Sequence, residues 1–550
     1  MGTKPEGGPV AVRAQEGLAD EKAAVRAAVF GHLAGMVVAP VMKALRDRGV
    51  FQLDFRGGVP FESIVEKTHG NRAYLRVALR ILRSCGWLEC RCDIFTLTAK
   101  GETALHLAPA VYDEVVRFIP LAIFLEDFLL RKLQGSILPS LQLLISRAKE
   151  GWDLPPETDH PAGATVRQIR LHADGVLIGP AMVALARGGV FERLERGPTE
   201  IKSLPGDQSC LAAILELLAA QGWVTRVGNK VSLTSAGAYA AQIATAYGVT
   251  VSYLPTFTVV STLLFGNARI PRLDDSGVEL LVNRAMNVWG SGGAHRTYFN
   301  KVDEIIIELF NRPVQQQPKG ICDMGCGDGA FLEHLYSVVR YQTERGKVLD
   351  KYPLILIGAD FNKVARRLSS QRLRKAGVPS FHVIHGDINR PAQLASAFEE
   401  LGHDAHDFLH VRSFLDHNRP WVPPSNYEPG ARVSRTTGVF AHLGEAISPD
   451  ELEENLVRHL RRWAPYAGRF GLLVLELHTL PAEITARNLD RTPTIAYDGT
   501  HGFSDQYLVE LPVFLECARE AGFAPDMRYQ ARFPPSDLAT VSINFFSAPG

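Results

Sequence analysis

Hydrophobic and polar positions follow different patterns in the two halves of the chain. In the C-terminal half, short apolar runs alternate with amphipathic segments of helical length. The strand-like runs are 320–323, 354–360, 381–385, 406–412, 471–479 and 540–546. Strands that alternate with helices predict an α/β domain with a doubly wound, mostly parallel sheet over 319–550, with antiparallel pairing at its end.

The N-terminal half has a helical period and contains an internal repeat. Residues 32–51 recur as 172–191, and each copy has a histidine, a glycine three residues later and a closing Gly-Val-Phe. A helix that ends in Gly-Trp follows in each copy, and then a Leu-Thr-x-x-Gly segment. Two helices, a glycine turn, a short strand and the Leu-Thr-x-x-Gly segment outline a winged-helix-like module, so we expect two such modules.

These patterns divide the chain into five segments. They are a mobile leader, two winged-helix-like repeats, connecting helices and the α/β core, at 1–27, 28–140, 165–270, 271–318 and 319–550. Winged-helix modules often read DNA with a basic helix, but the corresponding helix of the second copy, 209–221, has neither Lys nor Arg. We therefore expect the repeats to form a lid or a homodimer interface, with no nucleic acid as partner.

The composition narrows the class of protein further. Lys+Arg and Asp+Glu both number 59, so no net charge attracts nucleic acid or an anionic membrane. The seven cysteines have irregular spacing and do not form a disulfide framework. No uninterrupted apolar stretch is long enough to span a bilayer, and the first residues lack the apolar centre of a signal peptide. We expect a cytoplasmic protein without membrane association.

The most informative stretch joins the first strand of the core to the next helix. It contains three alternating glycines: Gly325, Gly327 and Gly329. Glycine allows a tight turn and the close approach of a ligand to the backbone. A dinucleotide-binding turn has similar spacing, but its ribose-binding acid should lie about twenty residues on, and Asp360 is farther away. Asp323 before the turn instead suits a cationic group, while Asp360 and Asp387 suit a ribose diol and an adenine amino group.

These elements resemble the nucleoside-binding signature of class I S-adenosylmethionine-dependent methyltransferases. The matching residues are Asp323-x-Gly325-x-Gly327-x-Gly329, Asp360 and Gly386-Asp387-Ile388. The resemblance implies a Rossmann-like core and S-adenosyl-L-methionine as the methyl donor. It also implies a set of cofactor-binding residues: Asp323, Gly325, Gly327, Asp360, Phe361, Asp387, Ile388 and Arg412.

Two other strand ends carry polar side chains. The run 413–421 follows one strand and contains His417, and Glu476 lies at the end of another. Ligands of parallel α/β sheets bind beyond the carboxyl ends of strands. The combination resembles the C-methyltransferases of polyketide synthases, which implies that His417 is the general base and that Glu476 orients its imidazole. A carbon acid activated by two carbonyl groups needs a base that works near neutral pH, as histidine does.

The segment 497–507 is predicted to be a loop that contains many side chains able to bind a ligand or a metal ion. It resembles the metal-dependent methyltransferases of polyketide loading modules, as does the helical N-terminal half. This implies a mononuclear iron or manganese ion held by His501 and Gln506. The two side chains could instead hydrogen-bond the substrate, because imidazole and an amide are a weak ligand pair without a carboxylate. Asp416 or Asp505 could supply that carboxylate.

The preferred interpretation is a C-methyltransferase of polyketide or other secondary-metabolite biosynthesis. Its substrate is a malonyl- or β-ketoacyl-type thioester, and its partner is an acyl carrier protein or a polyketide synthase subunit. The alternative is an O- or N-methyltransferase of a free small-molecule natural product, with the repeat as dimer interface. No carrier or synthase domain is visible, so we expect action in trans or excision from a larger protein.

The sequence does not determine the structure of two segments. The excursion at 423–438, rich in Pro, Gly and Ser, separates His417 from Glu476 and could misalign the pair. The glycine cluster at 289–293 predicts either a hinge that precedes a packing helix or a segment that closes over the cofactor.

Overall fold

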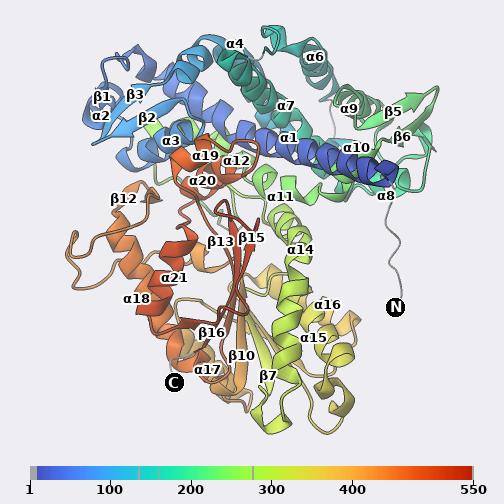
Figure 1. The fold of residues 1–550 in the computed structure, drawn as a ribbon, viewed down its shortest axis with the longest axis vertical. Coiled ribbons are helices and arrows are strands. Elements are labelled where there is room, and N and C mark those ends of the chain that lie inside the picture. The colour runs from blue at the N-terminus through green and yellow to red at the C-terminus, as the bar shows by residue number, and fades with distance from the viewer. Residues whose placement is uncertain (1–8, 134–136, 159, 276–277, 548–550) are drawn as a thin grey trace. The chain divides into compact units, whose positions relative to one another are not determined.

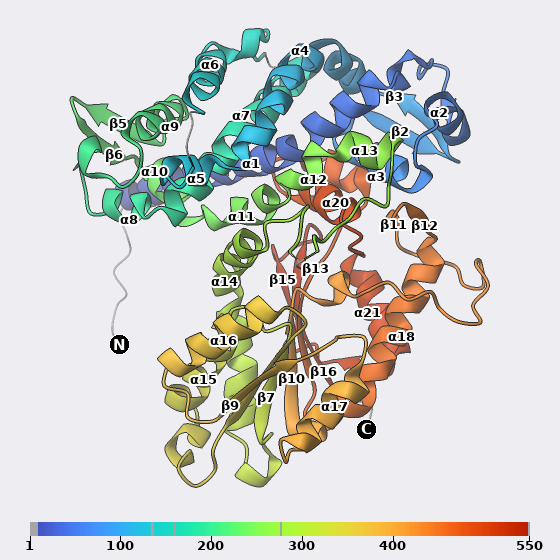
Figure 2. The same ribbon diagram turned by 180° about the vertical axis from the view of Figure 1, so that it is seen from behind.

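The computed structural model describes residues 9–133, 137–158, 160–275 and 278–547 (Figures 1 and 2). Its contacts divide the chain into two compact units. The N-terminal unit contains Met1–Asn71, Ala78–Gly293 and Ala482–Thr500, and the C-terminal unit contains Arg72–Val77, Ala294–Pro481 and His501–Gly550. Each unit therefore includes a segment that is distant in sequence from the rest of it.

The N-terminal unit is mostly helical. Its helices are α1 (Pro9–Asp47), α2 (Phe61–Thr68), α4 (Ala99–Ala122), α5 (Leu125–Leu129), α6 (Leu138–Lys149), α7 (Pro161–Arg187), α8 (Val190–Leu194), α9 (Gln208–Ala220), α10 (Ser235–Gln242), α11 (Thr245–Ser252), α12 (Leu254–Thr258), α13 (Val260–Phe265) and α19 (Ala482–Ala486), with parts of α3 (Arg72–Ser84), α14 (Arg284–Phe310) and α20 (Thr494–Gly502). Its strands are β1 (Val59–Pro60), β2 (Leu88–Arg91), β3 (Ile94–Leu97), β4 (Thr199–Glu200), β5 (Val224–Val227) and β6 (Lys230–Leu233).

The strands form two small sheets that confirm the two predicted winged-helix-like repeats. Their orders are β1-β3-β2 and β4-β6-β5, and both are antiparallel. The repeated Leu-Thr-x-x-Gly segment caps the following helix in each copy: Thr98 accepts a hydrogen bond from Gly101 N, and Thr234 accepts one from Gly237 N, both at 3.0 Å. A Cβ on either glycine would lie within 2.1 Å of a tryptophan carbonyl oxygen, so both positions require glycine.

Helices α1 and α7 cross at the glycines that the repeat shares. A Cβ on Gly35 would lie 2.1 Å from the carbonyl oxygen of His172, and a Cβ on Gly175 would lie 2.2 Å from that of His32. Each glycine therefore lies directly against the backbone of the other helix. The closest approach of the two helices occurs at equivalent positions, as a pseudo-twofold relation between the repeats requires.

His32 and His172, which occupy equivalent positions in the two repeats, also make equivalent side-chain contacts with the other repeat. His32 Nδ1 lies 2.7 Å from the hydroxyl of Tyr247 in the second repeat, and His172 Nδ1 lies 2.6 Å from the hydroxyl of Tyr112 in the first. Burial lowers the pKa of each imidazole to about 3, so both are neutral at physiological pH. The repeats thus exchange equivalent contacts, and neither half completes its core alone.

The long helices of this unit bear on two expectations, the absence of a membrane span and the mobile leader. Gly17–Asp47 and Ala162–Arg187 are long and apolar enough to cross a membrane by length and composition, although neither is an uninterrupted apolar run. Their most apolar windows are 78% and 83% buried in the protein, and the core helix of a soluble protein passes the same test. The expected leader at 1–27 is helical from Pro9, because α1 begins there, and residues 1–8 lie outside the described part of the chain.

The segment 482–500 joins the N-terminal unit from far along the chain. Arg80 Nε of α3 donates a hydrogen bond of 2.9 Å to Asp498 Oδ2 of α20, and both side chains are almost fully buried. A buried ion pair tolerates the loss of either partner poorly, because the remaining charge would stay desolvated. This pair fixes α20 against α3 within the unit.

The C-terminal unit is a doubly wound α/β domain. Its strands are β7 (Gly320–Met324), β8 (Ile355–Asp360), β9 (Phe381–His385), β10 (Phe408–Ser413), β11 (Phe440–His442), β12 (Glu445–Ile447), β13 (Leu472–Leu477), β14 (Ala524–Pro525), β15 (Ala531–Phe533) and β16 (Val541–Ser547). Its helices are α15 (Ala330–Gln342), α16 (Lys363–Lys375), α17 (Pro391–Glu400), α18 (Pro449–Ala467) and α21 (Leu511–Glu520), with the remainder of α3, α14 and α20. α14 runs without interruption across the glycine cluster at 289–293, so these glycines form helix and not a loop.

The main sheet has the order β14-β16-β13-β10-β7-β8-β9. β7, β8, β9, β10 and β13 are parallel, and β16 is antiparallel to β13. Side chains alternate between the two faces: Leu472 and Val474 pack with α17, α18 and α21, whereas Leu473 and Leu475 pack with α14 and α15. Figure 1 shows the helices on the two faces of this sheet. The topology confirms the predicted class I methyltransferase fold.

Candidate active site

The glycine turn after β7 has the geometry that its sequence predicts. Gly325, Gly327 and Gly329 all have positive φ, of 85°, 53° and 82°, and Gly325 N donates a hydrogen bond of 2.7 Å to Ala359 O on β8. A Cβ on Gly325 would lie 2.8 Å from the Leu415 side chain, whereas a Cβ on Gly327 would have no heavy atom within 4 Å. The space beside Gly327 is therefore where a ligand can approach the backbone.

Asp360 lies at the end of β8 and joins this strand to the turn. Its carboxylate accepts hydrogen bonds from Gly327 N at 3.1 Å and from Asn362 N at 2.7 Å. These two donors hold the acid at the carboxyl edge of the sheet, beside the open space at Gly327. A carboxylate in this position suits a ribose diol, as the sequence predicts.

Asp323 is buried at the end of β7, and only 1% of its surface is exposed. Its Oδ1 has no hydrogen-bond partner among the described residues. Burial, together with the nearby charge of Asp360, raises the pKa of Asp323 to about 8. A desolvated carboxyl group without a partner gains stability from a cationic ligand group. The orphaned oxygen and the open space at Gly327 fit the amino end and the nucleoside of S-adenosylmethionine, respectively.

The predicted adenine-binding residues follow β9. Asp387 Oδ1 accepts a hydrogen bond of 2.9 Å from Asn389 N, and Asp387 helps to line a cavity of about 400 Å³ with residues of α17. Ile388 is buried, and its carbonyl accepts a hydrogen bond from the Trp463 indole. Phe361 is 71% exposed, and its ring centroid lies 5.3 Å from that of His385. Its side chain thus faces the surface at the start of α16.

Arg412, predicted to contact the cofactor, lies in the core of the C-terminal unit. It is fully buried on β10, its Nη1 donates to Asp416 Oδ1, and its Cζ lies 4.2 Å from the centroid of the Trp463 ring on α18. Its Nε and Nη2 are buried and have no hydrogen-bond partner among the described residues. The contact of Arg412 with the cofactor therefore stays a prediction.

His417 and Glu476 meet at the carboxyl ends of β10 and β13. His417 Nδ1 lies 2.6 Å from Glu476 Oε1, and His417 N donates a hydrogen bond of 3.2 Å to Glu476 Oε2. The two side chains are 7% and 2% exposed. The adjacent parallel strands β10 and β13 set this distance, so the excursion at 423–438 does not misalign the pair. With Nδ1 held by the carboxylate, Nε2 is the nitrogen that can accept a proton.

A second group of polar residues holds the short helix η7 (Asp416–Asn418) that carries His417, and the sequence analysis named only Asp416 of this group, as a possible metal ligand. Asp416 Oδ1 accepts a hydrogen bond of 2.9 Å from His459 Nε2, and Asp416 O accepts one of 2.8 Å from Arg419 Nη1. Arg419 Nε donates in turn to Asn455 Oδ1 at 2.7 Å. Asn455 and His459 are one turn apart on α18 and both buried, a spacing that could have indicated their shared face.

His501 and Gln506 lie next to the pair of His417 and Glu476. His501 is on the last turn of α20, which corrects the expected loop at 497–507, and both side chains are buried. The ring centroids of His417 and His501 are 5.1 Å apart with an edge-on arrangement. Tyr507 N donates a hydrogen bond of 2.8 Å to His417 O, which places the segment that contains Gln506 beside the base.

The residues around His501 and Gln506 do not form a complete metal cage. Asp416 Oδ1 accepts hydrogen bonds from Arg412 and His459, whereas Asp416 Oδ2 is buried and has no partner among the described residues. Asp505 Oδ1 accepts hydrogen bonds from Tyr74 OH at 2.8 Å and Leu443 N at 3.1 Å. Among the described residues, no group of three or more His, Cys, Asp or Glu side chains could hold a metal ion. An imidazole and an amide without a carboxylate do not fit an iron or manganese ion by themselves.

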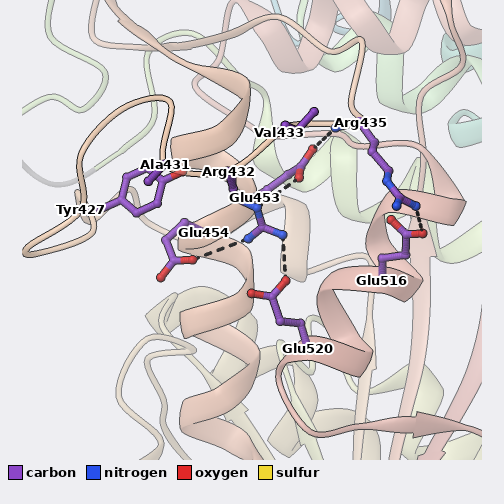
Figure 3. Close-up of a pocket in the computed structure, with 9 residues that line it drawn as sticks. All are labelled: Tyr427, Ala431, Arg432, Val433, Arg435, Glu453, Glu454, Glu516 and Glu520. Carbon is purple, nitrogen blue, oxygen red and sulfur yellow. Dashed lines mark hydrogen bonds and ion pairs between the residues drawn. The ribbon is translucent and has the colours of Figure 1, made fainter.

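The excursion at 423–438 forms a separate, ion-paired cavity of about 430 Å³ (Figure 3). Arg432 lies between α18 and α21, 3.5 Å from Glu454 and 2.7 Å from Glu520. Arg435 pairs with Glu516. These contacts hold the excursion against the two helices. The cavity lining includes neither His417 nor Glu476.

Comparison with known families gives three consecutive matches. Residues 25–90 match the AprA N-terminal domain, 174–267 match the AprA winged helix domain, and 279–544 match the AprA MT2-like methyltransferase domain. A 2-ketoarginine methyltransferase from Streptomyces arginensis is 26% identical over 210 residues, which are 37% of this chain and 58% of the relative. The chain thus spans a little over half the length of that curated relative.

Solved methyltransferase structures are also similar. A mitomycin 7-O-methyltransferase shares 15% identity at a TM-score of 0.40, over 70% of this chain and 98% of that chain. The human N-acetylserotonin methyltransferase, solved with S-adenosylmethionine, shares 12% identity at a TM-score of 0.40, over 70% and 97% of the two chains.

The family match covers the sheet, the glycine turn and the strand ends described above. The order of the strands and the buried, unpaired Asp323 beside an open glycine turn agree with it. The C-terminal unit therefore has the fold of a class I S-adenosylmethionine-dependent methyltransferase, and residues 279–544 are similar to the AprA MT2-like domain.

Proposed function

We propose that the protein transfers the methyl group of S-adenosylmethionine to a carbon atom next to a carbonyl group. The pairing of His417 with Glu476 carries this proposal, because it provides an oriented base where parallel strands present their ligands. A hydroxyl or amine substrate already has a lone pair for the attack. A carbon acid must first lose a proton, so it depends most strongly on such a base.

The proposed substrate is a malonyl- or β-ketoacyl-type thioester on an acyl carrier protein, in polyketide or related secondary-metabolite biosynthesis. The relative named a 2-ketoarginine methyltransferase supports the chemistry but not the carrier. A 2-keto acid and a β-carbonyl thioester share one feature, a C–H bond made acidic by an adjacent carbonyl group. This shared carbon acid is the part of the proposal that the relative supports.

The residues of the site have distinct parts in the proposed reaction. Bound S-adenosylmethionine supplies an electrophilic methyl group. Asp323 holds the amino end and Asp360 the ribose, while His417 Nε2 takes the proton from the substrate carbon. Glu476 keeps the other imidazole nitrogen protonated and stabilises the imidazolium. His501 and Gln506, both buried beside His417, donate hydrogen bonds to the carbonyl oxygen as it gains negative charge.

The position of the transferred methyl group tests the proposal. The purified protein is incubated with S-adenosylmethionine labelled with ¹³C in the methyl group, in separate reactions with malonyl-carrier protein, a 2-keto acid and a free phenol. NMR of the products distinguishes a methyl group on carbon from one on oxygen or nitrogen. We expect a C–CH₃ signal. Label on the oxygen of a free phenol, with none on carbon, would establish the alternative function instead.

The same reactions decide how His501 and Gln506 act. We expect His501→Ala to lose turnover and to retain its affinity for S-adenosylmethionine, because the nucleoside contacts lie on other strands. Elemental analysis of the wild-type protein and of this variant completes the test. A tightly bound iron or manganese ion that His501→Ala removes would assign the two side chains to a metal and not to direct hydrogen bonds.

A further inference from the structure

Helix α16 is the most strongly charged surface element of the C-terminal unit. In a chain with equal numbers of cations and anions, it has no acidic residue. Its basic residues are Lys363, Arg366, Arg367, Arg372, Arg374 and Lys375. This concentration on one helix produces a local positive field that the net charge of the protein does not reveal.

Two of these arginines form hydrogen bonds within the C-terminal unit. Arg372 Nη1 donates a hydrogen bond of 3.0 Å to Glu333, and its Nη2 donates to Asp328 in the glycine turn. Arg366 Nη1 donates a hydrogen bond of 2.7 Å to Asp360 O. These contacts attach α16 to the cofactor-binding turn. The other four cations are exposed, and within the described part of the chain none of them has an ion-pair partner: Lys363, Arg367, Arg374 and Lys375.

Apolar side chains are exposed among these cations. Val364 is 52% exposed and Leu368 is 40% exposed, and they lie one helical turn apart. Arg367 and Lys375 continue the same stripe. Phe361, immediately before the helix, is 71% exposed. We define the α16 face as Phe361, Lys363, Val364, Arg367, Leu368, Arg374 and Lys375.

We infer that the α16 face is the docking surface for the acidic carrier protein that presents the substrate. This inference rests on the proposed function, because that function requires a thioester on a carrier. An acidic, amphipathic protein surface matches both components of the face, since its carboxylates pair with the cations and its apolar residues cover Val364 and Leu368. A phosphate backbone would match the cations but would leave the apolar side chains in water.

The position of α16 in the fold suits this task. The helix follows β8 directly, so its first turn lies at the carboxyl edge of the sheet, where β10 presents His417. β8 and β10 are separated by β7, so their ends are roughly 10 Å apart at the usual strand spacing. A thioester arm from a protein docked on α16 can thus enter the site along the same edge. Figure 2 shows α16 beside α15, on one face of the sheet.

Variants in which cations of the α16 face are replaced by glutamate test whether this face acts in carrier binding and not in methyl transfer. The test variant is Arg367→Glu/Arg374→Glu, and the matched control is Lys351→Glu/Arg519→Glu, two exposed cations outside α16 that likewise have no ion-pair partner among the described residues. Each protein is assayed with malonyl-carrier protein and with the malonyl thioester of free pantetheine. Binding of unloaded carrier protein and of a DNA duplex is measured by biolayer interferometry at several salt concentrations.

The test variant should bind the carrier protein about tenfold more weakly than the wild type and show a correspondingly higher KM for the loaded carrier. Its kcat for the pantetheine thioester and all constants of the control should stay unchanged. Leu368→Ser should weaken carrier binding without changing its salt dependence. Equal carrier binding by the wild type and the test variant would overturn the inference. DNA binding that the test variant loses, without carrier binding, would also overturn it. If neither thioester is methylated, the proposed function fails, but the binding experiment still tests the surface.

Discussion

His417 Nδ1 and Glu476 Oε1 lie 2.6 Å apart although 59 residues separate them in the chain. The connection between them includes the excursion at 423–438 and the whole of α18, yet neither affects the distance. β10 and β13 are adjacent and parallel in the sheet, so their carboxyl ends must coincide. The backbone N–H of His417 also donates to Glu476, so the carboxylate holds both the ring and the short helix that carries it.

The first prediction concerns this pair. Glu476→Gln should lower kcat by about 10²–10⁴-fold, because the amide cannot stabilise the imidazolium and does not select the correct tautomer. The affinity for S-adenosylmethionine, measured by calorimetry, should remain within about twofold, since the proposed nucleoside contacts lie on β7, β8 and β9. A variant that retains the wild-type kcat would remove Glu476 from the proposed chemistry.

The second prediction uses the raised pKa of Asp323. In the folded protein, burial raises this pKa from 3.8 to about 8, so the folded state holds a proton that the unfolded chain loses at much lower pH. This carboxyl therefore lowers the stability of the ligand-free protein progressively as the pH rises from about 4 to about 8. Asp323→Asn removes that dependence. The melting temperature of the variant should exceed that of the wild type by a margin that grows with pH up to about 8.

Cofactor binding by the same variant should change in the opposite direction. An amide cannot pair with the amino end of S-adenosylmethionine, so the affinity should fall while the ligand-free protein becomes more stable. Thermal scans at several pH values, with and without the cofactor, measure both effects. A constant difference in melting temperature across the pH range would show that Asp323 has no raised pKa.

The third prediction separates the two contacts of Asp360. Asp360→Ala loses the ribose contact and the hydrogen bonds from Gly327 N and Asn362 N, and should weaken S-adenosylmethionine binding by about 1.5–3 kcal/mol. Asp360→Asn keeps an acceptor for the turn and should retain more of the stability than of the affinity. Calorimetry and thermal denaturation of both variants provide the comparison. Unchanged affinity in Asp360→Ala would place the ribose elsewhere.

The fourth prediction concerns the crossing of α1 and α7. Gly35→Leu places a side chain where the His172 backbone lies, and because the backbone cannot yield as a flexible side chain can, we expect a loss of more than about 3 kcal/mol. Gly17→Ala in the same helix is the matched control. A Cβ there meets no heavy atom within 4 Å, so higher helix propensity should make this change neutral or stabilising by about 1 kcal/mol. Equal melting temperatures for the two variants would contradict the crossing.

Local patterns in the sequence determined much of this protein. The alternation of strands and helices predicted the doubly wound domain. The glycine turn and the acids at the ends of β7 and β8 predicted the edge of the sheet proposed for the cofactor, because each is a short-range feature of the chain. The repeated Leu-Thr-x-x-Gly segment likewise identified both winged-helix modules. Its threonine caps a helix and its glycine lies against a tryptophan carbonyl, two contacts that leave little freedom of sequence.

Contacts between distant segments were decided only by the tertiary structure. Arg412 pairs locally with Asp416, four residues on, but its contact with the Trp463 ring depends on the packing of α18 against β10. The residues 482–500 follow β13 in the chain, yet the ion pair of Asp498 with Arg80 assigns them to the N-terminal unit. Asn455 and His459 of α18 likewise contact Arg419 and Asp416, beside His417, only because α18 packs against this part of the sheet. In each case a buried polar group must find a partner once the chain has folded, and the identity of that partner depends on which elements become neighbours.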